Sequence, residues 1–390
     1  MDTRAAEPAR PRLHGLVSRP GAAPARATGA RARPRWRLAI LLLAAVALAA
    51  GVLGGLVRAG VALPEHWQGE WLAQGVLQHA ALMICGFFGT VVAMERAVAL
   101  NMRYAFAAPL LSGLGAVALL AGQARAGGAL LVAAALVFCI ASVQIVRRQR
   151  AAHTRVLLAG ALCWLAANLA FALGAAPLAT LAGWLAFLVV TIAAERLEMT
   201  RLMRRHAGAQ PALVAILAAL IGGAVLCVAA PRAGAALYGA ALLGLAAWLG
   251  LFDIARRTIA ANGLSRYMAL ALLLGYGWLA IGGAAWLGMA LGLPTRDAAL
   301  HAVGLGFIVS MVMAHAPVIL PAVARIKLLY GPWFYAPLAL LHGSLLLRIG
   351  FGLSDAGLRR TGAWLNALAI ALFALTMAAS ALAWKRRKAA

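Results

Sequence analysis

The apolar residues of this chain fall into twelve long runs, separated by short segments that are polar, basic or interrupted by glycine and proline. A bilayer core about 30 Å thick is crossed by roughly 20 helical residues, which is the length of these runs. Backbone amides in lipid must be hydrogen-bonded within their own span, so such runs predict helices and exclude alternating barrel strands. The predicted spans cover about 38–58, 73–97, 105–122, 128–146, 156–174, 178–197, 211–230, 234–254, 267–292, 298–321, 333–352 and 362–384.

Composition supports this pattern, because 64% of the 390 residues are hydrophobic and only 12% are charged. We therefore predict an all-α fold, a polytopic membrane helical bundle of about twelve transmembrane helices forming one unit over residues 38–385. The abundance of alanine and glycine predicts helices whose backbones approach closely. Residues 1–37 are rich in arginine, alanine and proline, which indicates a disordered basic cytoplasmic arm, and 386–390 form a short cytoplasmic tail.

The net charge of +25 is concentrated in segments between spans, such as RRQRAAHTR (147–155), ERLEMTRLMRRH (195–206) and the terminal KRRK (385–388). Short loops rich in lysine and arginine face the cytoplasm, so these segments and an even span count predict that both termini are cytoplasmic. Nucleic-acid binding needs a basic face on a soluble fold, which this distribution does not offer. We therefore expect the lipid bilayer, and no nucleic acid, as a partner.

Histidines at the heads of two spans are the first candidate site. His79 lies near the start of 73–97 and His301 near the start of 298–321, and both spans run from outside to inside. The two imidazoles are thus expected at similar depth. Neutral imidazole is a common haem ligand, and a pair on facing helices can clamp a b-type haem. The alternative is two interfacial histidines that are hydrogen-bonded to neighbouring carbonyl groups.

A second candidate lies further along the same span. Met311 and His315 are four residues apart and therefore share one helix face. A thioether with an imidazole suits copper, especially Cu(I), although a methionine-filled core beside a hydrogen-bonded histidine explains the pair as well. His342, in the next span, is a further histidine that could face the same cavity. The four cysteines lie in apolar runs without a CxxC motif and are expected to be small buried side chains: Cys85, Cys139, Cys163 and Cys227.

Two Glu-Arg pairs, Glu95-Arg96 and Glu195-Arg196, close spans two and six. They are expected to be interfacial pairs that fix helix orientation, with a proton or anion pathway as the alternative. Spans two and ten also share a His-Ala step followed by Gly-Phe. This faint repeat suggests that spans two, six and ten are equivalent positions in three four-helix units.

Two segments carry a family resemblance: HAALMICGFFGTVVA (79–93), followed by Pro109-Leu110, and HAVGLGFIVSM (301–311). Over about residues 38–385 the chain resembles a divergent member of the NnrS family of bacterial inner-membrane proteins. The resemblance implies bound haem and copper, and a role in nitric oxide metabolism or nitrosative-stress resistance. His79 and His301 match the histidines that open the two motifs, and Met311 matches a methionine of the second.

The chain departs from that family pattern in three places. A further histidine, expected in a Gly-His-Thr-Gly stretch after span ten, is replaced by Val323 and its neighbours. His315 is an additional histidine, and span six ends in Glu195-Arg196 where a Gly-Gly-Arg and aromatic pattern is expected. These departures concern the copper assignment more than the haem assignment.

These observations lead to a haem-binding membrane protein of the nitric oxide response, non-enzymatic or weakly catalytic, with nitric oxide or an electron donor as possible partners. A cofactor-free transporter or scaffold, in which the histidines are structural or line a proton path, is the alternative. A third reading is a nitric oxide reductase related to haem–copper oxidases. That reading is disfavoured because spans six to nine lack the histidines of a binuclear centre. The oligomeric state stays open.

Overall fold

The computed structural model describes residues 35–200, 208–324 and 326–389. Most of the basic arm predicted at 1–37 lies outside the described residues, as do 201–207, 325 and 390. From Arg35 onward the chain forms one compact unit. Within the described ranges the secondary structure is helical, without strands.

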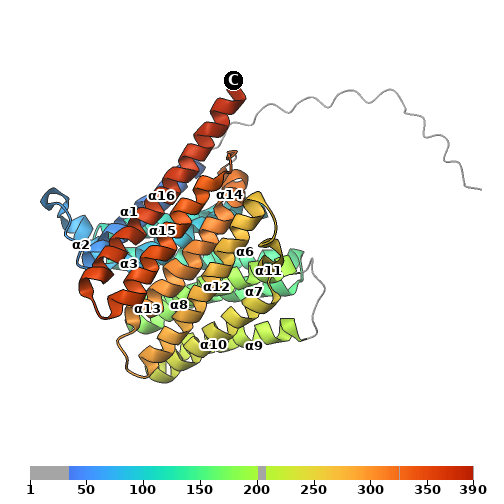
Figure 1. The fold of residues 1–390 in the computed structure, drawn as a ribbon. Coiled ribbons are helices and arrows are strands. Elements are labelled where there is room, and N and C mark those ends of the chain that lie inside the picture. Colours follow the sequence, from blue (N-terminus) through green and yellow to red (C-terminus); the bar gives the residue numbers. More distant parts are fainter. Residues whose placement is uncertain (1–34, 201–207, 325, 390) are drawn as a thin grey trace, which may run out of the picture. The chain divides into compact units, whose positions relative to one another are not determined.

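The helices follow one another with short connections (Figure 1). The first half contains α1 (Arg35–Arg58), η1 (Glu65–Trp67), α2 (Glu70–Leu77), α3 (His79–Ala81), η2 (Leu82–Gly89), α4 (Thr90–Leu100), η3 (Arg103–Phe106), α5 (Ala107–Leu120), α6 (Ala124–Arg148), α7 (Ala152–Ala172) and α8 (Pro177–Met199). The second half contains α9 (Ala209–Ala229), α10 (Pro231–Phe252), α11 (Ala255–Thr258), α12 (Gly263–Ala290), α13 (Arg296–His301), η5 (Ala302–Val309), α14 (Ser310–Ala324), η6 (Pro332–Phe334), α15 (Tyr335–Leu345), η7 (Leu346–Gly350), η8 (Phe351–Leu353) and α16 (Ala356–Ala389).

In the described part of the chain, twelve continuous helices are long and apolar enough to cross a membrane. Four of them join several elements: span two is His79–Leu100, span three is Arg103–Leu120, span ten is Arg296–Pro321 and span eleven is Pro332–Leu353. The predicted fold class is confirmed, and the chain is a multi-pass membrane protein built as an α-helical bundle.

Most predicted boundaries shift by a few residues in the structure, and two of these shifts change how the chain is divided. Span two was expected from residue 73, but the helix breaks at Gln78, whose ψ of 13° takes the backbone out of the helical region. Helix α2 is therefore a separate short helix, and His79 is the first residue of its span. At the other end, α16 continues to Ala389, so the basic residues of the predicted tail at 386–389 belong to the helix. Lysine and arginine are good helix formers, so the helix continues through them. A prediction based on hydropathy alone ends the span where these charged residues begin.

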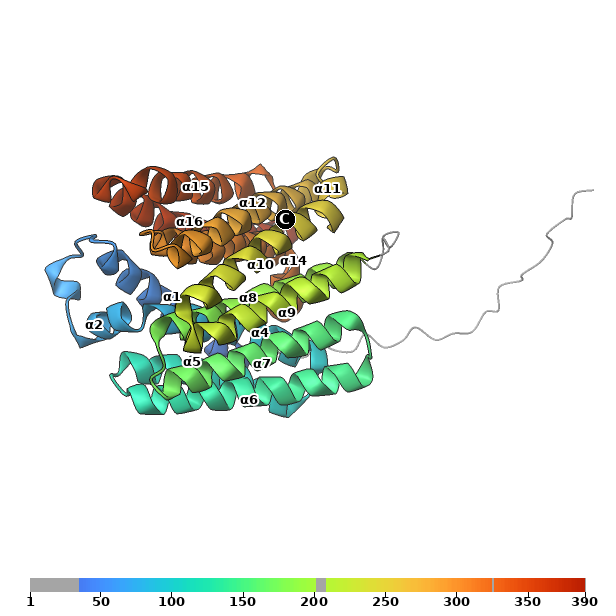
Figure 2. The ribbon, with the colours of Figure 1, turned by 90° about the horizontal axis from the view of Figure 1, so that it is seen from below.

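Spans two, six and ten form the centre of the bundle. Their apolar windows are 67%, 72% and 61% buried, the three highest values among the described spans, whereas that of α16 is 22% buried. Figure 2 shows α8 between α6 and α7 on one side and α12, α15 and α16 on the other. The three spans that the sequence repeat relates are therefore the most buried of the described spans.

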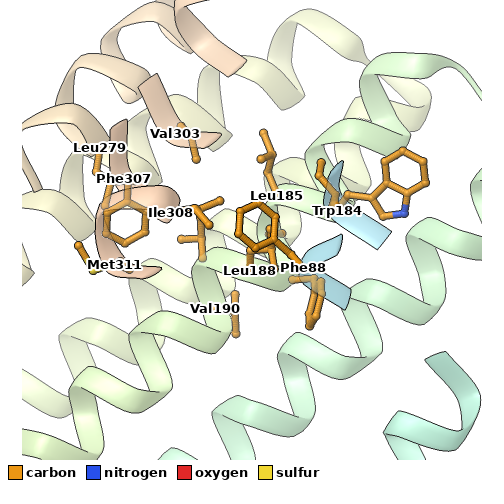
Figure 3. Close-up of a cluster of buried hydrophobic side chains, with 14 of the residues drawn as sticks. Phe88, Trp184, Leu185, Leu188, Val190, Leu279, Val303, Phe307, Ile308 and Met311 are labelled. Carbon is orange, nitrogen blue, oxygen red and sulfur yellow. The ribbon is translucent and has the colours of Figure 1, made fainter. Parts of the chain in front are cut away.

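An apolar cluster joins these three spans (Figure 3). Phe88 of η2, Leu188 of α8 and Ile308 of η5 all belong to the buried core. Figure 3 also shows Phe307 and Met311 at the α12 side of the cluster, and each is almost completely buried. Because lipid is as apolar as these side chains, close packing is the main source of stability at such a junction.

Close backbone approach is visible where α10 crosses α12. A Cβ atom added to Gly239 would lie 2.7 Å from the carbonyl oxygen of Gly283 and 2.9 Å from the amide nitrogen of Leu287. No side chain fits there without separating the helices. Small residues at helix crossings allow this kind of packing in membranes, where apolar side chains gain little from leaving lipid.

A cavity lined by two histidines and three arginines

The structure brings His79 and His301 together. Their ring centroids are 6.5 Å apart and the ring planes are inclined by 32°. A metal ion bound between two imidazole nitrogens at about 2.0–2.1 Å from each would separate the ring centres by roughly 6–6.5 Å. Packed aromatic rings without a metal span about 4.5–7 Å, so the distance fits a shared metal without requiring one.

Both histidines line a cavity of about 580 Å³. This volume is within the range of about 300–1,000 Å³ that is usual for ligand and cofactor pockets. Three arginines also contribute to the wall: Arg58 at the end of α1, Arg296 at the start of α13, and Arg348 in η7. Most of the remaining lining is apolar and includes Phe88, Leu188 and Ile308 from the cluster in Figure 3. The cavity thus combines cationic side chains with a largely apolar wall.

His79 is fixed by contacts with α1. Its Nδ1 lies 2.6 Å from the backbone oxygen of Gly51, so this nitrogen carries the proton and donates it. Within the described ranges no hydrogen bond engages Nε2 of His79, which leaves that lone pair for another ligand. The ring also lies against Gly55, where an added Cβ atom would be 2.6 Å from Cε1 of His79. Helix α1 therefore determines both the tautomer and the position of this imidazole.

His301 has a different environment. Its Nδ1 is 2.9 Å from the backbone oxygen of Asp297 and 3.0 Å from the Oδ1 atom of that residue. Arg348 forms two bonds to the Asp297 carboxylate, of 2.9 Å from Nε and 2.7 Å from Nη2. Nη2 of Arg348 also lies 3.1 Å from Nε2 of His301. The same Nη2 atom is 3.2 Å from Nδ1 of His301, so the guanidinium lies over the face of the imidazole ring and not along the lone pair of Nε2.

Each of the three key side chains is associated with a π-helical segment. His79 precedes η2 by three residues, His301 directly precedes η5, and Arg348 lies within η7. Segments η2 and η5 contain eight residues each, and η7 contains five. π-Helical turns are rare and occur frequently at functional sites, because they change the direction of side chains within an otherwise regular helix. Span six (α8), the third position of the proposed repeat, is a regular α-helix.

The second predicted pair, Met311 and His315, lies toward the opposite end of span ten. Nδ1 of His315 donates to the backbone oxygen of Met311 at 2.8 Å, while Nε2 is 3.3 Å from Nη1 of Arg196. The Met311 side chain is buried against Gly275 of α12. Among the described residues, no group of three or more His, Cys, Asp or Glu side chains is arranged to hold a metal ion. The copper ligands therefore stay a prediction.

The Glu-Arg pairs connect different helices instead of pairing locally. Arg96 of span two binds Glu195 of span six at 2.7 Å. Arg196, the neighbour of Glu195, pairs with the buried Asp253 at 3.2 Å. Charged groups at this end thus join spans two and six and the end of α10, in agreement with an orienting role.

His342 is buried outside the lining of this cavity, with Nε2 3.5 Å from Oγ of Ser310. It accepts a hydrogen bond of 2.7 Å from Trp278 and stacks on that indole. The four cysteines are free and buried: Cys85, Cys139, Cys163 and Cys227.

Arg348 and Asp297 are site residues that the sequence analysis did not identify. Arg348 is the one charged residue within LALLHGSLLLRIGFG (338–352), and a charged residue inside an apolar span is by itself a sign of a partner nearby. Asp297 precedes His301 by four residues, which places both on one helix face. These two signals were present in the sequence, but only tertiary structure brings Arg348 to them.

The residues present fit a haem better than they fit a copper ion. Two imidazoles at a suitable separation meet the requirement for axial ligands, and the arginines match the carboxylates of the haem propionates. The apolar wall suits the macrocycle, and an added Cβ atom at Gly304 would meet open space. Arg348 covers one face of the His301 ring, with Nη2 3.1 Å from Nε2 and 3.2 Å from Nδ1.

Comparison with known proteins yields one family match. The description "Domain of unknown function (DUF8744)" fits residues 37–382, which is nearly the whole membrane bundle. No curated protein and no solved structure matches the chain. Since the family match covers well over half of the sequence, the chain belongs to the DUF8744 family.

Proposed function

We propose that this protein is an NnrS-like haem-binding membrane protein in which His79 and His301 hold a b-type haem. The observation that supports the proposal is the pair of imidazoles, 6.5 Å apart, on the wall of a 580 Å³ cavity. A haem bound there would supply an iron that binds nitric oxide or exchanges electrons. The chain orients the group through His79 and its cationic arginines, and its apolar wall keeps water away.

The biological setting is part of the same proposal. The resemblance of the two histidine segments to the NnrS family supports a role in nitric oxide metabolism or resistance to nitrosative stress in a bacterial inner membrane. The basic clusters at 147–155 and 385–388 support cytoplasmic termini. With this orientation the cavity faces the outer leaflet. A C-terminal fluorescent-protein fusion is then expected to fluoresce, whereas a C-terminal alkaline phosphatase fusion is expected to be inactive.

The test is an optical spectrum of protein purified in detergent from cells with ample haem, oxidised and then reduced with dithionite. A sharp Soret band and resolved α and β bands on reduction are expected for low-spin haem with two imidazole ligands. His79→Ala and His301→Ala should each lose this low-spin spectrum. His66→Ala, in the exposed turn η1, and His315→Ala, at the other end of span ten, should retain it. A featureless spectrum of the unsubstituted protein would refute the proposal and favour the cofactor-free transporter or scaffold.

A further inference from the structure

We propose that Arg58 and Arg296 recognise the two carboxylates of an amphipathic dianion, which enters the cavity through a mouth at one end of the bundle. This inference rests on the proposed function and deepens it, because it says which part of the ligand each end of the cavity takes. It depends on the carboxylates and the apolar body of a porphyrin, and not on a metal at its centre.

The mouth lies at the end of the bundle at which α1 ends and spans two, six and ten begin. Among the lining residues, the exposed ones are all found at helix ends or in the connection between α7 and α8. Lining residues farther along the helices are buried or half-buried. The cavity is therefore entered from the bundle end and not through a lipid-facing side. The mouth is made of Arg58, Leu77, Gly174, Pro177 and Arg296.

The mouth carries two positive charges that the described part of the chain does not neutralise. Arg58 donates a hydrogen bond of 3.3 Å to the backbone oxygen of Val76 and forms no ion pair within the described ranges. Arg296 has neither a hydrogen bond nor an ion pair there. Arg348, in contrast, is committed to Asp297 by two hydrogen bonds. Two uncompensated guanidinium groups match a ligand with two carboxylates.

The two arginines lie nearer the mouth than the two imidazoles do. Arg296 precedes His301 by five residues of one continuous span, which is about 7–8 Å at roughly 1.5 Å per residue. Arg58 follows Gly55, the residue in contact with His79, by three residues or about 4.5 Å. Deeper than the imidazoles, the lining is mostly apolar. The cavity thus orients a ligand with its carboxylates at the mouth and its apolar body inside.

Esterification of the ligand isolates the contribution of the arginines. A porphyrin dimethyl ester has nearly the same apolar body as the parent acid but no negative charge, so it fills the cavity without pairing with a guanidinium. Because the mouth is exposed to solvent, each pair is expected to contribute about fivefold in affinity, at the upper end for exposed ion pairs. Salt should reduce this advantage of the acid, since exposed charges are screened.

The experiment uses the full chain, purified in detergent from cells in which haem synthesis is blocked. Binding of haem and of haem dimethyl ester is measured by quenching of tryptophan fluorescence, because Trp184 lines the cavity. Arg58→Gln and Arg296→Gln should each bind haem about fivefold more weakly, and the double variant about twenty-five-fold more weakly. The ester should bind to all four proteins with equal affinity. Metal-free protoporphyrin IX and its dimethyl ester should show the same differences.

Arg232→Gln is the matched control for charge. Arg232 is exposed in the first turn of α10, at the same end of the bundle, but it does not line the cavity. Its substitution should leave the affinity for haem unchanged. If Arg58→Gln does not fold, Arg296→Gln carries the comparison alone, since the Arg296 side chain makes no hydrogen bond in the described structure.

The route of entry is tested with a single introduced cysteine. Leu77, in the mouth, is 69% exposed, and Leu291, at the end of α12 and outside the lining, is 81% exposed. After reaction with a bulky maleimide, Leu77→Cys should take up haem at least tenfold more slowly, whereas Leu291→Cys should take it up at the original rate. An unchanged rate in labelled Leu77→Cys would overturn entry through the mouth.

The remaining outcomes separate this inference from the proposed function. Equal affinities of acid and ester, or arginine variants that bind haem as the unsubstituted protein does, would overturn the inference and keep the proposed function. Preference for the acid of metal-free protoporphyrin IX, without a low-spin spectrum when haem is added, would support the inference and refute ligation by the two histidines. Absence of binding of any of these porphyrins would overturn both.

Discussion

Replacing Gly55 by alanine adds one methyl group at the contact between α1 and His79. The new Cβ atom would lie 2.6 Å from Cε1 and 2.9 Å from Nδ1 of the imidazole. Carbon atoms in contact prefer about 3.5–4.0 Å, so the ring or the helix must move by roughly 1 Å. Overpacking of this kind costs about 1–3 kcal/mol, partly offset by about 1 kcal/mol gained when alanine replaces glycine in a helix. The net effect on folding is therefore small.

The effect on haem binding should be large. Metal–ligand distances are satisfied only within about 0.2 Å, so a displacement of roughly 1 Å removes His79 from ligation range. We expect Gly55→Ala to reach the membrane and purify like the unsubstituted protein, but to lose most of its haem. The assay is haem content per polypeptide, from the pyridine haemochrome spectrum, together with thermal unfolding in detergent.

The matched control is Gly277→Ala in α12, where an added Cβ atom would meet open space. This variant should keep its haem. Normal haem content and an unchanged low-spin spectrum in Gly55→Ala would refute the reasoning, because they would show that contact with α1 does not determine the position of a haem ligand. Loss of folded protein in Gly55→Ala alone would contradict the estimated stability change.

Three further predictions concern the bundle. Glu195→Gln breaks the ion pair with Arg96 and should lower the midpoint of thermal unfolding in detergent. Glu65→Gln, in the exposed η1, should leave this midpoint unchanged. Equal midpoints for the two variants would contradict an orienting role of Glu195. Gly239→Val should separate α10 from α12 and strongly reduce the yield of folded protein, whereas Gly277→Val should leave that yield unchanged. The yield is measured as the amount of monodisperse protein in size-exclusion chromatography. The four buried cysteines should react with a small maleimide only after denaturation in dodecyl sulfate; rapid labelling of the native protein, counted by mass spectrometry, would contradict their burial.

The number and position of the spans could be predicted from the sequence because lipid imposes a minimum length on every apolar helix. The break at Gln78 could not be predicted in this way. Hydropathy is averaged over a window of residues, and it therefore does not detect a single residue that leaves the helical region. Its effect on the site is direct, because it makes His79 the first residue of span two.

The candidate site was predicted in part. Similar depth of His79 and His301 follows from their positions in two parallel spans, but their contact depends on which spans pack together. Arg348 comes from a span of opposite direction, and only the packing of η7 against α16 and the ion pair with Asp297 of α13 bring it to the same cavity. π-Helical hydrogen bonding leaves no pattern of its own in the order of apolar residues, so η2, η5 and η7 were not expected.

The apolar cluster of Phe88, Leu188 and Ile308 has an electrical consequence (Figure 3). It lies between the cationic cavity at the head of span ten and the ion pairs at its other end, so it acts as a layer of low dielectric constant. An isolated ion crossing such a layer loses several kcal/mol of solvation without compensation. In this structure the cluster therefore raises the free energy of any ion that passes from the cavity toward the ion pairs at the other end of span ten.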